Sequence, residues 1–301
     1  MRNFVTYGCI AIALSTWANI GAAATQCSTT STFSSHSGAG NAFLGDNGNC
    51  SKDAESFKLK VYEFAICTGH ATVADQSMCT TLFQDTAGSD LILSKGASLP
   101  LGADVTLAEG TYTHAYIHVD NVMHLKVSHE FSSVRRDRGG TNSGIYCYSN
   151  GVDRAYDVSG NLVNSIITCS NTAPTTATNL PTKETLSFAV DDGNNKEKWV
   201  SSMVDNATGT NLYMLKADGK ASTSLATDDT ILASQDITDV VISPTTAGMN
   251  IAFTVTDTVG LMIQEAGAPA NAITCPGGPA GTPDCVVDSA WIGMQFLVTA
   301  K

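Results

Sequence analysis

Basic residues are scarce in this 301-residue chain, which carries 16 Lys and Arg against 28 Asp and Glu, for a formal net charge of −12. Such an excess of negative charge repels polyanions, which excludes binding to nucleic acid or anionic lipid as the main task. Glutamate is also rare, with seven residues against 21 aspartates. Glutamate favours helices and aspartate favours turns, and no long stretch keeps a 3.6-residue apolar period, so we expect few helices.

The sequence also lacks the short motifs that carry several common chemistries. It contains no G-x-S-x-G elbow, no H-E-x-x-H pair, no Gly-Lys-Ser/Thr phosphate loop and no C-x-x-C pair. These absences predict that the protein is not an enzyme. A glycosidase stays open, because it needs only two carboxylates placed by the fold.

The start of the chain predicts an export signal. Arg2 provides a positive charge, residues 5–20 are mostly apolar or small, and three small residues end at Ala24. This pattern is typical of a secretory signal peptide, so we expect residues 1–24 to be removed. The remainder is then secreted, extracellular or on the cell surface, or in the periplasm, with no transmembrane segment. Two other interpretations are a retained membrane anchor and a lipid attached at Cys27.

The number of cysteines becomes even once residues 1–24 are removed. Removal takes Arg2 and Cys9 away, which leaves eight of nine cysteines and a net charge of −13. In an exported chain this favours disulfides over metal binding or redox chemistry. The short separations of 23, 12, 22 and 10 residues favour four local pairs: Cys27–Cys50, Cys67–Cys79, Cys147–Cys169 and Cys275–Cys285.

Alternating residues predict many short strands. Within 111–120 the odd positions from Ala115 to Val119 are apolar, and the even positions from His114 to Asp120 are polar or aromatic. Strand-like runs recur roughly every ten residues between turn residues, which predicts an all-β, disulfide-stabilised β-sandwich or jelly-roll-like fold. The other runs are 57–67, 80–84, 123–129, 145–149, 162–169, 185–190, 198–204, 211–216, 237–242, 250–256, 259–264 and 286–299. Residues 107–112 (Leu-Ala-Glu-Gly-Thr-Tyr) resemble a turn-and-strand phrase of transthyretin-like and related secreted sandwich domains, and this six-residue resemblance implies a fold only.

One segment without charge suggests a domain boundary. Residues 171–181 contain two prolines and no charged residue. We predict a linker at 171–183 between an N-terminal β domain at 25–170 and a C-terminal β domain at 184–301. The alternative is a single domain in which this segment is a long loop crossing a sheet.

Four of the six histidines lie close together, at positions 114, 118, 124 and 129. His114 and His118 are about 13 Å apart on one strand, too far to share an ion. A hairpin near Asp120 would bring His118 and His124 together, with Asp120 as a third ligand. This suggests a zinc or copper site at His114, His118, Asp120 and His124. The alternative is that these are polar histidines on a solvated sheet face without a metal, and we favour this interpretation.

Aspartate-rich turns are candidates for a calcium ion. Residues 46–49 and 191–195 offer carboxylates and carbonyls, and 228–229 offers two more carboxylates. No segment matches a full EF-hand loop, so ordinary turns are favoured. We therefore expect no cofactor, and calcium is the alternative.

Arginine is concentrated in one place. Arg135, Arg136 and Arg138 are three of the four arginines that remain after residues 1–24 are removed. We expect them to form a loop that either docks on an acidic patch of a neighbouring copy or is simply solvated.

The last twelve residues, 290–301, form a long apolar run. We expect a central strand within the fold, with donation of this strand to the next copy as the alternative. The features together predict a secreted or cell-surface structural or adhesive protein, such as a subunit of an extracellular filament or coat. Its partners are then copies of itself or other surface proteins. A carbohydrate-binding or carbohydrate-processing module and a periplasmic metal-binding protein are the alternatives.

Overall fold

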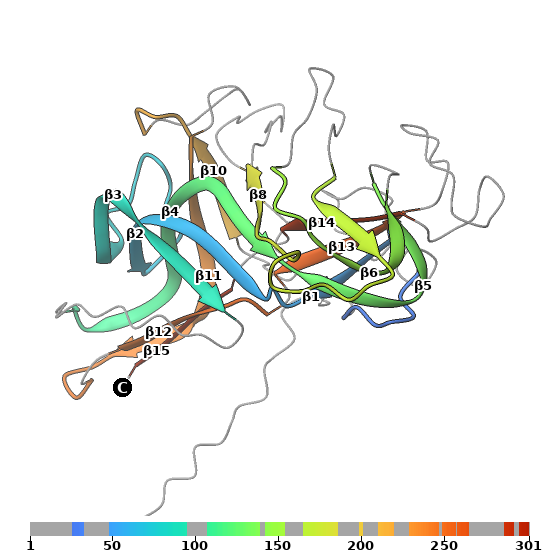
Figure 1. Ribbon diagram of the computed structural model, residues 1–301. Coiled ribbons are helices and arrows are strands. Elements are labelled where there is room, and N and C mark those ends of the chain that lie inside the picture. Colours follow the sequence, from blue (N-terminus) through green and yellow to red (C-terminus); the bar gives the residue numbers. More distant parts are fainter. Residues whose placement is uncertain are drawn as a thin grey trace, which may run out of the picture.

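The protein is described by a computed structural model over residues 26–32, 48–94, 107–138, 142–153, 165–185, 199–200, 210–219, 229–246, 249–256, 258–264, 286–291 and 295–300. Regular structure in these ranges consists of β-strands, which confirms the all-β prediction (Figure 1). Within the same ranges, no helix has the length and apolar character needed to cross a membrane. The predicted signal peptide at 1–24 lies outside the described residues.

The larger sheet has seven strands and is called the β4 sheet after its longest strand. Its order is β3-β2-β4-β11-β10-β9, and β8 pairs with β4 beside this path. In Figure 1 the long β4 strand sweeps across the molecule, with β2 and β3 to its left. The bounds are β2 (Ser56–Cys67), β3 (Cys79–Ser94), β4 (Gly110–Lys126), β8 (Thr182–Thr185), β9 (Trp199–Val200), β10 (Thr210–Leu215) and β11 (Thr230–Ile242).

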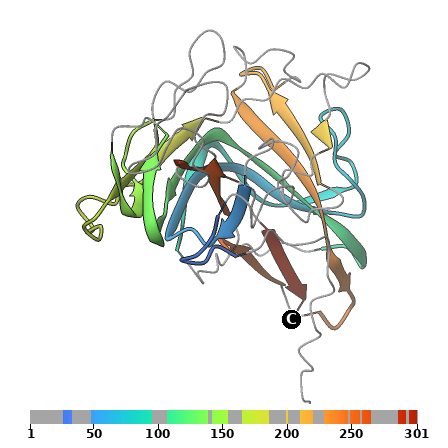
Figure 2. The ribbon, with the colours of Figure 1, turned by 90° about the vertical axis from the view of Figure 1, so that its right-hand side faces the viewer.

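The second large sheet has six strands and is called the β5 sheet. Its order is β1-β13-β14-β5-β6-β7, and a separate antiparallel pair joins β12 to β15. Figure 2, turned by a quarter, shows the β12–β15 pair beside the C-terminus. The bounds are β1 (Gly48–Lys52), β5 (Ser128–Asp137), β6 (Ser143–Ser149), β7 (Ile167–Ser170), β12 (Met249–Thr254), β13 (Val259–Gln264), β14 (Val286–Trp291) and β15 (Gln295–Ala300).

The chain passes directly from one large sheet to the other at Val127, the single residue between β4 and β5. Val127 is buried; its N–H donates to Ser149 Oγ at 3.2 Å, and its carbonyl accepts from Ser149 N at 2.9 Å. Strands that switch sheets make corners in packed β structures. The short segment 53–55 links β1 to β2 in the same way.

Alternate residues of both sheets meet in one core. Ala115, Ile117 and Val119 of β4 are buried in it, which confirms the predicted alternation. Large members of the same core from the two sheets are Phe57, Leu59, Phe131, Leu261 and Ile263. A second, smaller apolar cluster contains Tyr116, which points to the opposite face of β4 because its neighbours Ala115 and Ile117 face the main core.

The predicted hairpin at Asp120 and Asn121 is wrong, because β4 continues unbroken over Gly110–Lys126. Asp120 Oδ1 accepts a hydrogen bond from Val122 N at 2.9 Å, and Asn121 N donates to Asp229 O at 3.3 Å. The register between β4 and β2 shifts here. The extra residues are therefore absorbed as a bulge, which bends the strand instead of reversing it.

Strands from both sides of residues 171–183 share the two large sheets. β4 pairs with β11, and β1 pairs with β13. The predicted division into domains 25–170 and 184–301 does not coincide with these sheets. The segment itself is anchored, since buried Asn179 donates to Glu55 Oε2 at 2.9 Å and accepts from Ser149 Oγ at 2.7 Å.

The C-terminal run at 290–301 does not form one central strand. It contributes to β14 in the β5 sheet and to β15 in the separate pair with β12. Val298 of β15 is buried in the main core. The strand therefore packs within its own fold, as expected, although in a different sheet from β14.

Three of the four predicted disulfides are confirmed: Cys27–Cys50, Cys67–Cys79 and Cys147–Cys169. Two of them join residues that lie directly opposite each other on neighbouring strands, Cys67 with Cys79 and Cys147 with Cys169. Cys275 and Cys285 lie outside the described residues.

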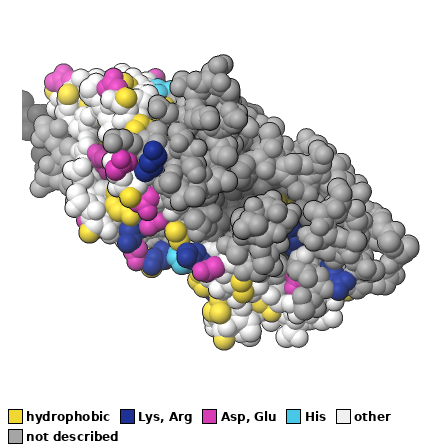
Figure 3. Space-filling view, turned by 90° about the horizontal axis from the view of Figure 1, so that it is seen from above, with side chains coloured by type: hydrophobic (Ala, Val, Ile, Leu, Met, Phe, Trp, Pro, Cys, Tyr) yellow, Lys and Arg dark blue, Asp and Glu magenta, His cyan; other side chains and the backbone are white. Residues whose placement is uncertain are grey.

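The described surface mixes charges of both signs with a few large apolar side chains (Figure 3). Ile92 of β3 is 65% exposed and Val241 of β11 is 59% exposed. Other exposed apolar residues are Val134, Val152 and Leu180. Single exposed apolar residues are ordinary on a protein surface, so these residues by themselves do not indicate a binding site.

Candidate metal centre

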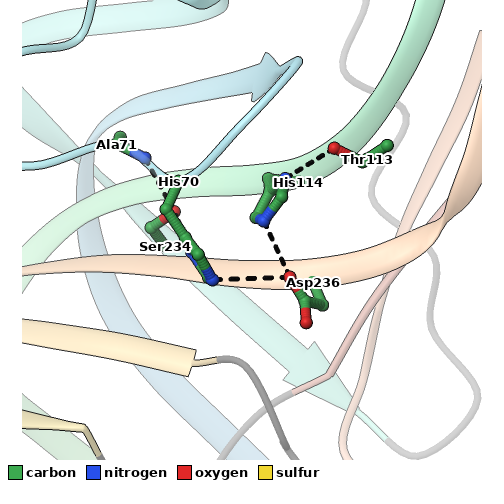
Figure 4. Close-up of polar contacts among 6 residues, drawn as sticks. All are labelled: His70, Ala71, Thr113, His114, Ser234 and Asp236. Atoms are coloured by element: carbon green, nitrogen blue, oxygen red, sulfur yellow. Dashed lines mark hydrogen bonds and ion pairs between the residues drawn. The ribbon is translucent and has the colours of Figure 1, made fainter.

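One cross-strand row on the β4 sheet joins a disulfide to two polar side chains. Cys79 of β3 faces Cys67 of β2, Cys67 faces His114 of β4, and His114 faces Asp236 of β11. Directly opposed residues point to the same face with their Cβ atoms about 5 Å apart. This spacing places His114 Nε2 only 2.7 Å from Asp236 Oδ1 (Figure 4). The register of β11 shifts immediately after Asp236, and bulges of this kind re-aim a side chain.

His70 reaches the same carboxylate from the loop between β2 and β3. Its Nε2 lies 3.5 Å from Asp236 Oδ1, and its ring packs edge-on against His114 with centroids 4.1 Å apart. The Cys67–Cys79 disulfide closes the loop at its base. Within the loop, Thr72 N donates to Asp75 O at 2.9 Å, so the backbone that carries His70 is internally braced.

Hydroxyl groups hold the far side of both imidazole rings. His70 Nδ1 lies 3.1 Å from Ser234 Oγ, and His114 Nδ1 lies 2.6 Å from Thr113 Oγ1. Ser234 is fully buried and also accepts a hydrogen bond from Ala71 N at 3.0 Å. A hydroxyl can donate or accept, so each ring can carry its proton on Nδ1 and present a bare Nε2. That is the form in which histidine binds a metal, and the hydroxyls fix its orientation.

The three facing groups have the geometry of a metal site. One ligand atom from each of His70, His114 and Asp236 lies within 4.8 Å of the others. Ligands of a tetrahedral zinc ion, each about 2.0–2.1 Å from the metal, stand about 3.4 Å apart. Side-chain rotations that move each ligand atom by roughly an ångström therefore bring the two Nε2 atoms and the carboxylate oxygen into contact with one ion. No backbone rearrangement is needed, because β4 and β11 already hold two of the residues in register.

The donor set selects the class of ion. Two imidazoles and one carboxylate suit zinc, copper or iron, whereas calcium prefers six to eight oxygens. The side chains of His70, His114 and Asp236 are 32%, 15% and 51% exposed. The site therefore lies at the surface, with water available to complete the coordination.

Of the four residues predicted to bind a metal, the site contains only His114. His118 Nε2 instead contacts Thr230 Oγ1 at 2.8 Å, and burial lowers the pKa of its imidazole. Asp120 caps its own bulge, and His124 lies farther along β4, opposite Lys58 and Lys183. The predicted cluster fails because its hairpin does not exist.

The other two ligands have no local sequence signal. His70 and its partner Ser234 are 164 residues apart, and no spacing pattern connects them. The one signal in the sequence was the alternation that puts His114 on the outer face of a strand. The packing of the whole fold decides which strand pairs with β4 beside His114.

The arginine cluster belongs to the fold, which corrects the expectation of an open loop. Arg135 lies in β5 and is buried, with Nη2 donating to Ser31 O at 2.9 Å and its guanidinium 4.9 Å from the centre of the Phe131 ring. Arg138 Nη1 lies 3.3 Å from Asp288 Oδ2, and Asp288 is fully buried. Arg136 pairs in register with Val286 in the parallel β14–β5 contact.

The predicted calcium turns fall mostly on residues that the structure does not describe, namely 46–47, 191–195 and 228. Asp229 is described, and its backbone N–H donates to Leu215 O at 2.8 Å.

Comparison with protein-family models, curated proteins and solved structures returns no match. The site must therefore be interpreted from its own geometry.

Proposed function

We propose that this protein is an exported, non-enzymatic β protein that binds a transition-metal ion, with zinc as its first candidate, at His70, His114 and Asp236. One observation carries the proposal: three ligand atoms from three separate segments lie within 4.8 Å of one another. Two of the ligands come from rigid neighbouring strands. The third comes from a loop that the Cys67–Cys79 disulfide closes.

The location and architecture remain part of the proposal. Three disulfides favour an oxidising compartment outside the cytoplasm, which supports secretion or display at the cell surface or in the periplasm. A β-sandwich or jelly-roll-like arrangement is supported by the core shared between the two large sheets and by the corner at Val127.

Zinc titration calorimetry of the disulfide-intact protein tests the metal proposal. We expect one zinc ion per chain, with binding weakened by more than about 100-fold in His70→Ala, His114→Ala and Asp236→Asn, since even loss of a supporting residue costs 10–100-fold. His118→Ala is the matched control, because this histidine lies on the same strand but outside the site. Equal zinc binding by all the variants, or none by the wild type, overturns the proposal.

A second candidate function is the structural or adhesive role of a filament or coat subunit. It is favoured by Ile92, which is 65% exposed on β3. Among the described strands, β3 is paired on one side only, and exposed edges invite pairing with another chain. The bulge around residues 85–88 interrupts this edge, so the segment that carries Ile92 is the part available for assembly.

Electron microscopy of the purified protein tests this second function. Filaments or ordered arrays that disappear in Ile92→Lys and persist in Val134→Lys support it. Monomers across a range of salt, calcium and protein concentration contradict it.

A further inference from the structure

The outermost strands of the two large sheets differ in length and in protection. Over the described residues, β7 has four residues and β9 has two, whereas β3 has 16. The outer edge of β1 is covered, because Gln26 forms a parallel bridge with Ser51 and Cys27 N donates to Ser51 O at 2.8 Å. No described strand covers the outer edge of β3, which pairs with β2 alone. An edge of this length is a template for pairing with another chain.

The edge of β3 is regular only in its second half. Residues 85–88 have no partner in the register with β2, and Asp85 Oδ2 accepts a hydrogen bond across this bulge from Ser89 Oγ at 2.7 Å. Bulges twist an edge away from an approaching chain, so the first half of β3 is protected. Residues 89–94 pair with β2 one for one, so their outer edge is regular and can accept another strand.

The side chains of residues 89–94 fit a second copy of the same segment in one register. In antiparallel pairing about a two-fold axis, each residue faces the one equally far on the other side of the axis. An axis at Asp90 sets two aspartates face to face, and an axis at Leu91 sets Asp90 opposite Ile92. An axis at Ile92 pairs Ile92, which is 65% exposed, with its own copy, buried Leu91 with buried Leu93, and Asp90 with Ser94. Opposed apolar pairs stabilise a sheet and opposed like charges destabilise it, so the axis at Ile92 is favoured.

The charged groups beside this axis nearly balance. Lys60 faces Asp90 across the β2–β3 ladder, and Lys58 Nζ lies 2.7 Å from Asp90 Oδ2. The contact therefore brings no concentrated negative charge together. The formal net charge of −12 still repels two copies at a distance, and salt screens that repulsion. Pairing should consequently strengthen as salt rises, which is the reverse of a contact held by ion pairs.

We propose that two copies of this chain pair through residues 89–94 of β3, antiparallel about a two-fold axis at Ile92, which joins their β4 sheets into one. Such a contact uses the same surface on both copies and closes on itself. β3 alone therefore yields a dimer, and a filament needs a second contact between dimers. The inference rests on the second candidate function, self-assembly, for which it names the partner and the symmetry. It is independent of the metal site.

Oxidative cross-linking of Ile92→Cys tests the two-fold axis. At about 1 mM protein, even a dimer with a Kd of about 1 mM holds about half of the chains. We expect disulfide-linked dimers joined at position 92, because directly opposed residues have Cβ atoms about 5 Å apart, and more of them as salt rises. Val241→Cys is the matched control, since Val241 is 59% exposed but lies on β11.

Mixtures of two variants test the register. Asp90→Cys protein mixed with Ser94→Cys protein should form cross-linked dimers, because these two positions face each other. Asp90→Cys alone should not cross-link, since its two copies stand four residues apart along the strands, or roughly 13 Å. In sedimentation velocity, Ile92→Lys should lose the dimer and Val134→Lys should keep it.

Two results overturn the inference: cross-linking of Ile92→Cys no greater than that of Val241→Cys, or equal cross-linking of Asp90→Cys alone and in the mixture. Filaments seen by electron microscopy without these cross-links would keep the second candidate function and overturn only the two-fold pairing. The absence of both filaments and cross-links would remove both proposals.

Discussion

Cys67 and His114 lie directly opposite each other on β2 and β4, so a disulfide and a candidate metal ligand occupy one cross-strand row. Cys67 is fully buried, and its bridge to Cys79 closes the loop that carries His70. The disulfide thus supports the site from two directions. It fixes the strand end beside one histidine and the base of the loop that presents the other.

Removing this disulfide should weaken zinc binding as well as stability. The Cys67→Ala/Cys79→Ala variant frees the ends of a loop of 12 residues, which costs about 3 kcal/mol of unfolding free energy. Zinc affinity should fall as well, because His70 loses its fixed approach to Asp236. Urea unfolding and zinc calorimetry measure the two effects.

Cys147→Ala/Cys169→Ala is the matched control for that prediction. It removes another cross-strand bridge, with a separation of 22 residues, far from the site in the β5 sheet. Its stability should fall by a similar amount while zinc affinity stays unchanged. If both double variants lost the same zinc affinity, the Cys67–Cys79 disulfide would affect zinc binding only through the stability of the whole fold.

Ser234→Ala should affect stability and zinc binding together. Ser234 is fully buried and accepts a hydrogen bond from Ala71 N, so its loss leaves a buried N–H without that acceptor and costs about 1–3 kcal/mol. It also releases His70 Nδ1, which should lower zinc affinity about 10–100-fold. Thr81→Ala removes an exposed hydroxyl bond to Glu63 on the same sheet and should leave both measurements nearly unchanged.

Arg138→Ala tests whether the arginine cluster serves the fold. The change removes the guanidinium beside fully buried Asp288, and we expect a loss of about 1–3 kcal/mol because Arg138 is itself 26% exposed. Sedimentation velocity should show an unchanged oligomeric state. Wild-type stability combined with altered assembly would instead restore the contact between copies that the sequence suggested.

The local patterns of the sequence predicted the parts of the fold that neighbouring residues determine. Alternation identified β2 and the first half of β4, and short spacing identified the disulfides that close local loops. The pairing of Asp236 with His114 depends on which strands become neighbours, and that follows from the global packing of the core. The bulge at Asp120 was mistaken for a turn because an aspartate–asparagine pair suits both, and the difference is set by β2 and β11 on either side.

Acid should destabilise the protein in part through His129. Burial lowers the pKa of its imidazole below the usual 6.5, with Lys52 and Arg135 acting in the same direction and Ser28 and Glu130 opposing them. Because Lys52 Nζ can only donate to Nδ1 at 3.3 Å, Nε2–H donates to Ser28 O at 2.9 Å and the ring is neutral. Between the folded pKa and 6.5 the unfolded chain binds more protons. The contribution of His129 to the free energy of unfolding is therefore full above about pH 6.5, and it declines as the pH falls toward the pKa of His129 in the folded protein.

Urea unfolding of the wild type and of His129→Gln between about pH 7.5 and pH 5 measures this contribution. The free energy of unfolding of the variant should fall less steeply with decreasing pH than that of the wild type, because glutamine does not titrate. His118 and His124, whose pKa values burial also lowers, should account for a share of what remains. Parallel stability curves for the two proteins would contradict the assignment.

Diffraction measured across the zinc absorption edge, from crystals grown with zinc, is the most direct test of zinc binding at His70, His114 and Asp236. We expect one anomalous peak, from a zinc ion bound by His70 Nε2, His114 Nε2 and a carboxylate oxygen of Asp236 at distances of about 2.0–2.2 Å. Zinc found elsewhere, or no peak at this site in protein whose Cys67–Cys79 disulfide is intact, would contradict it.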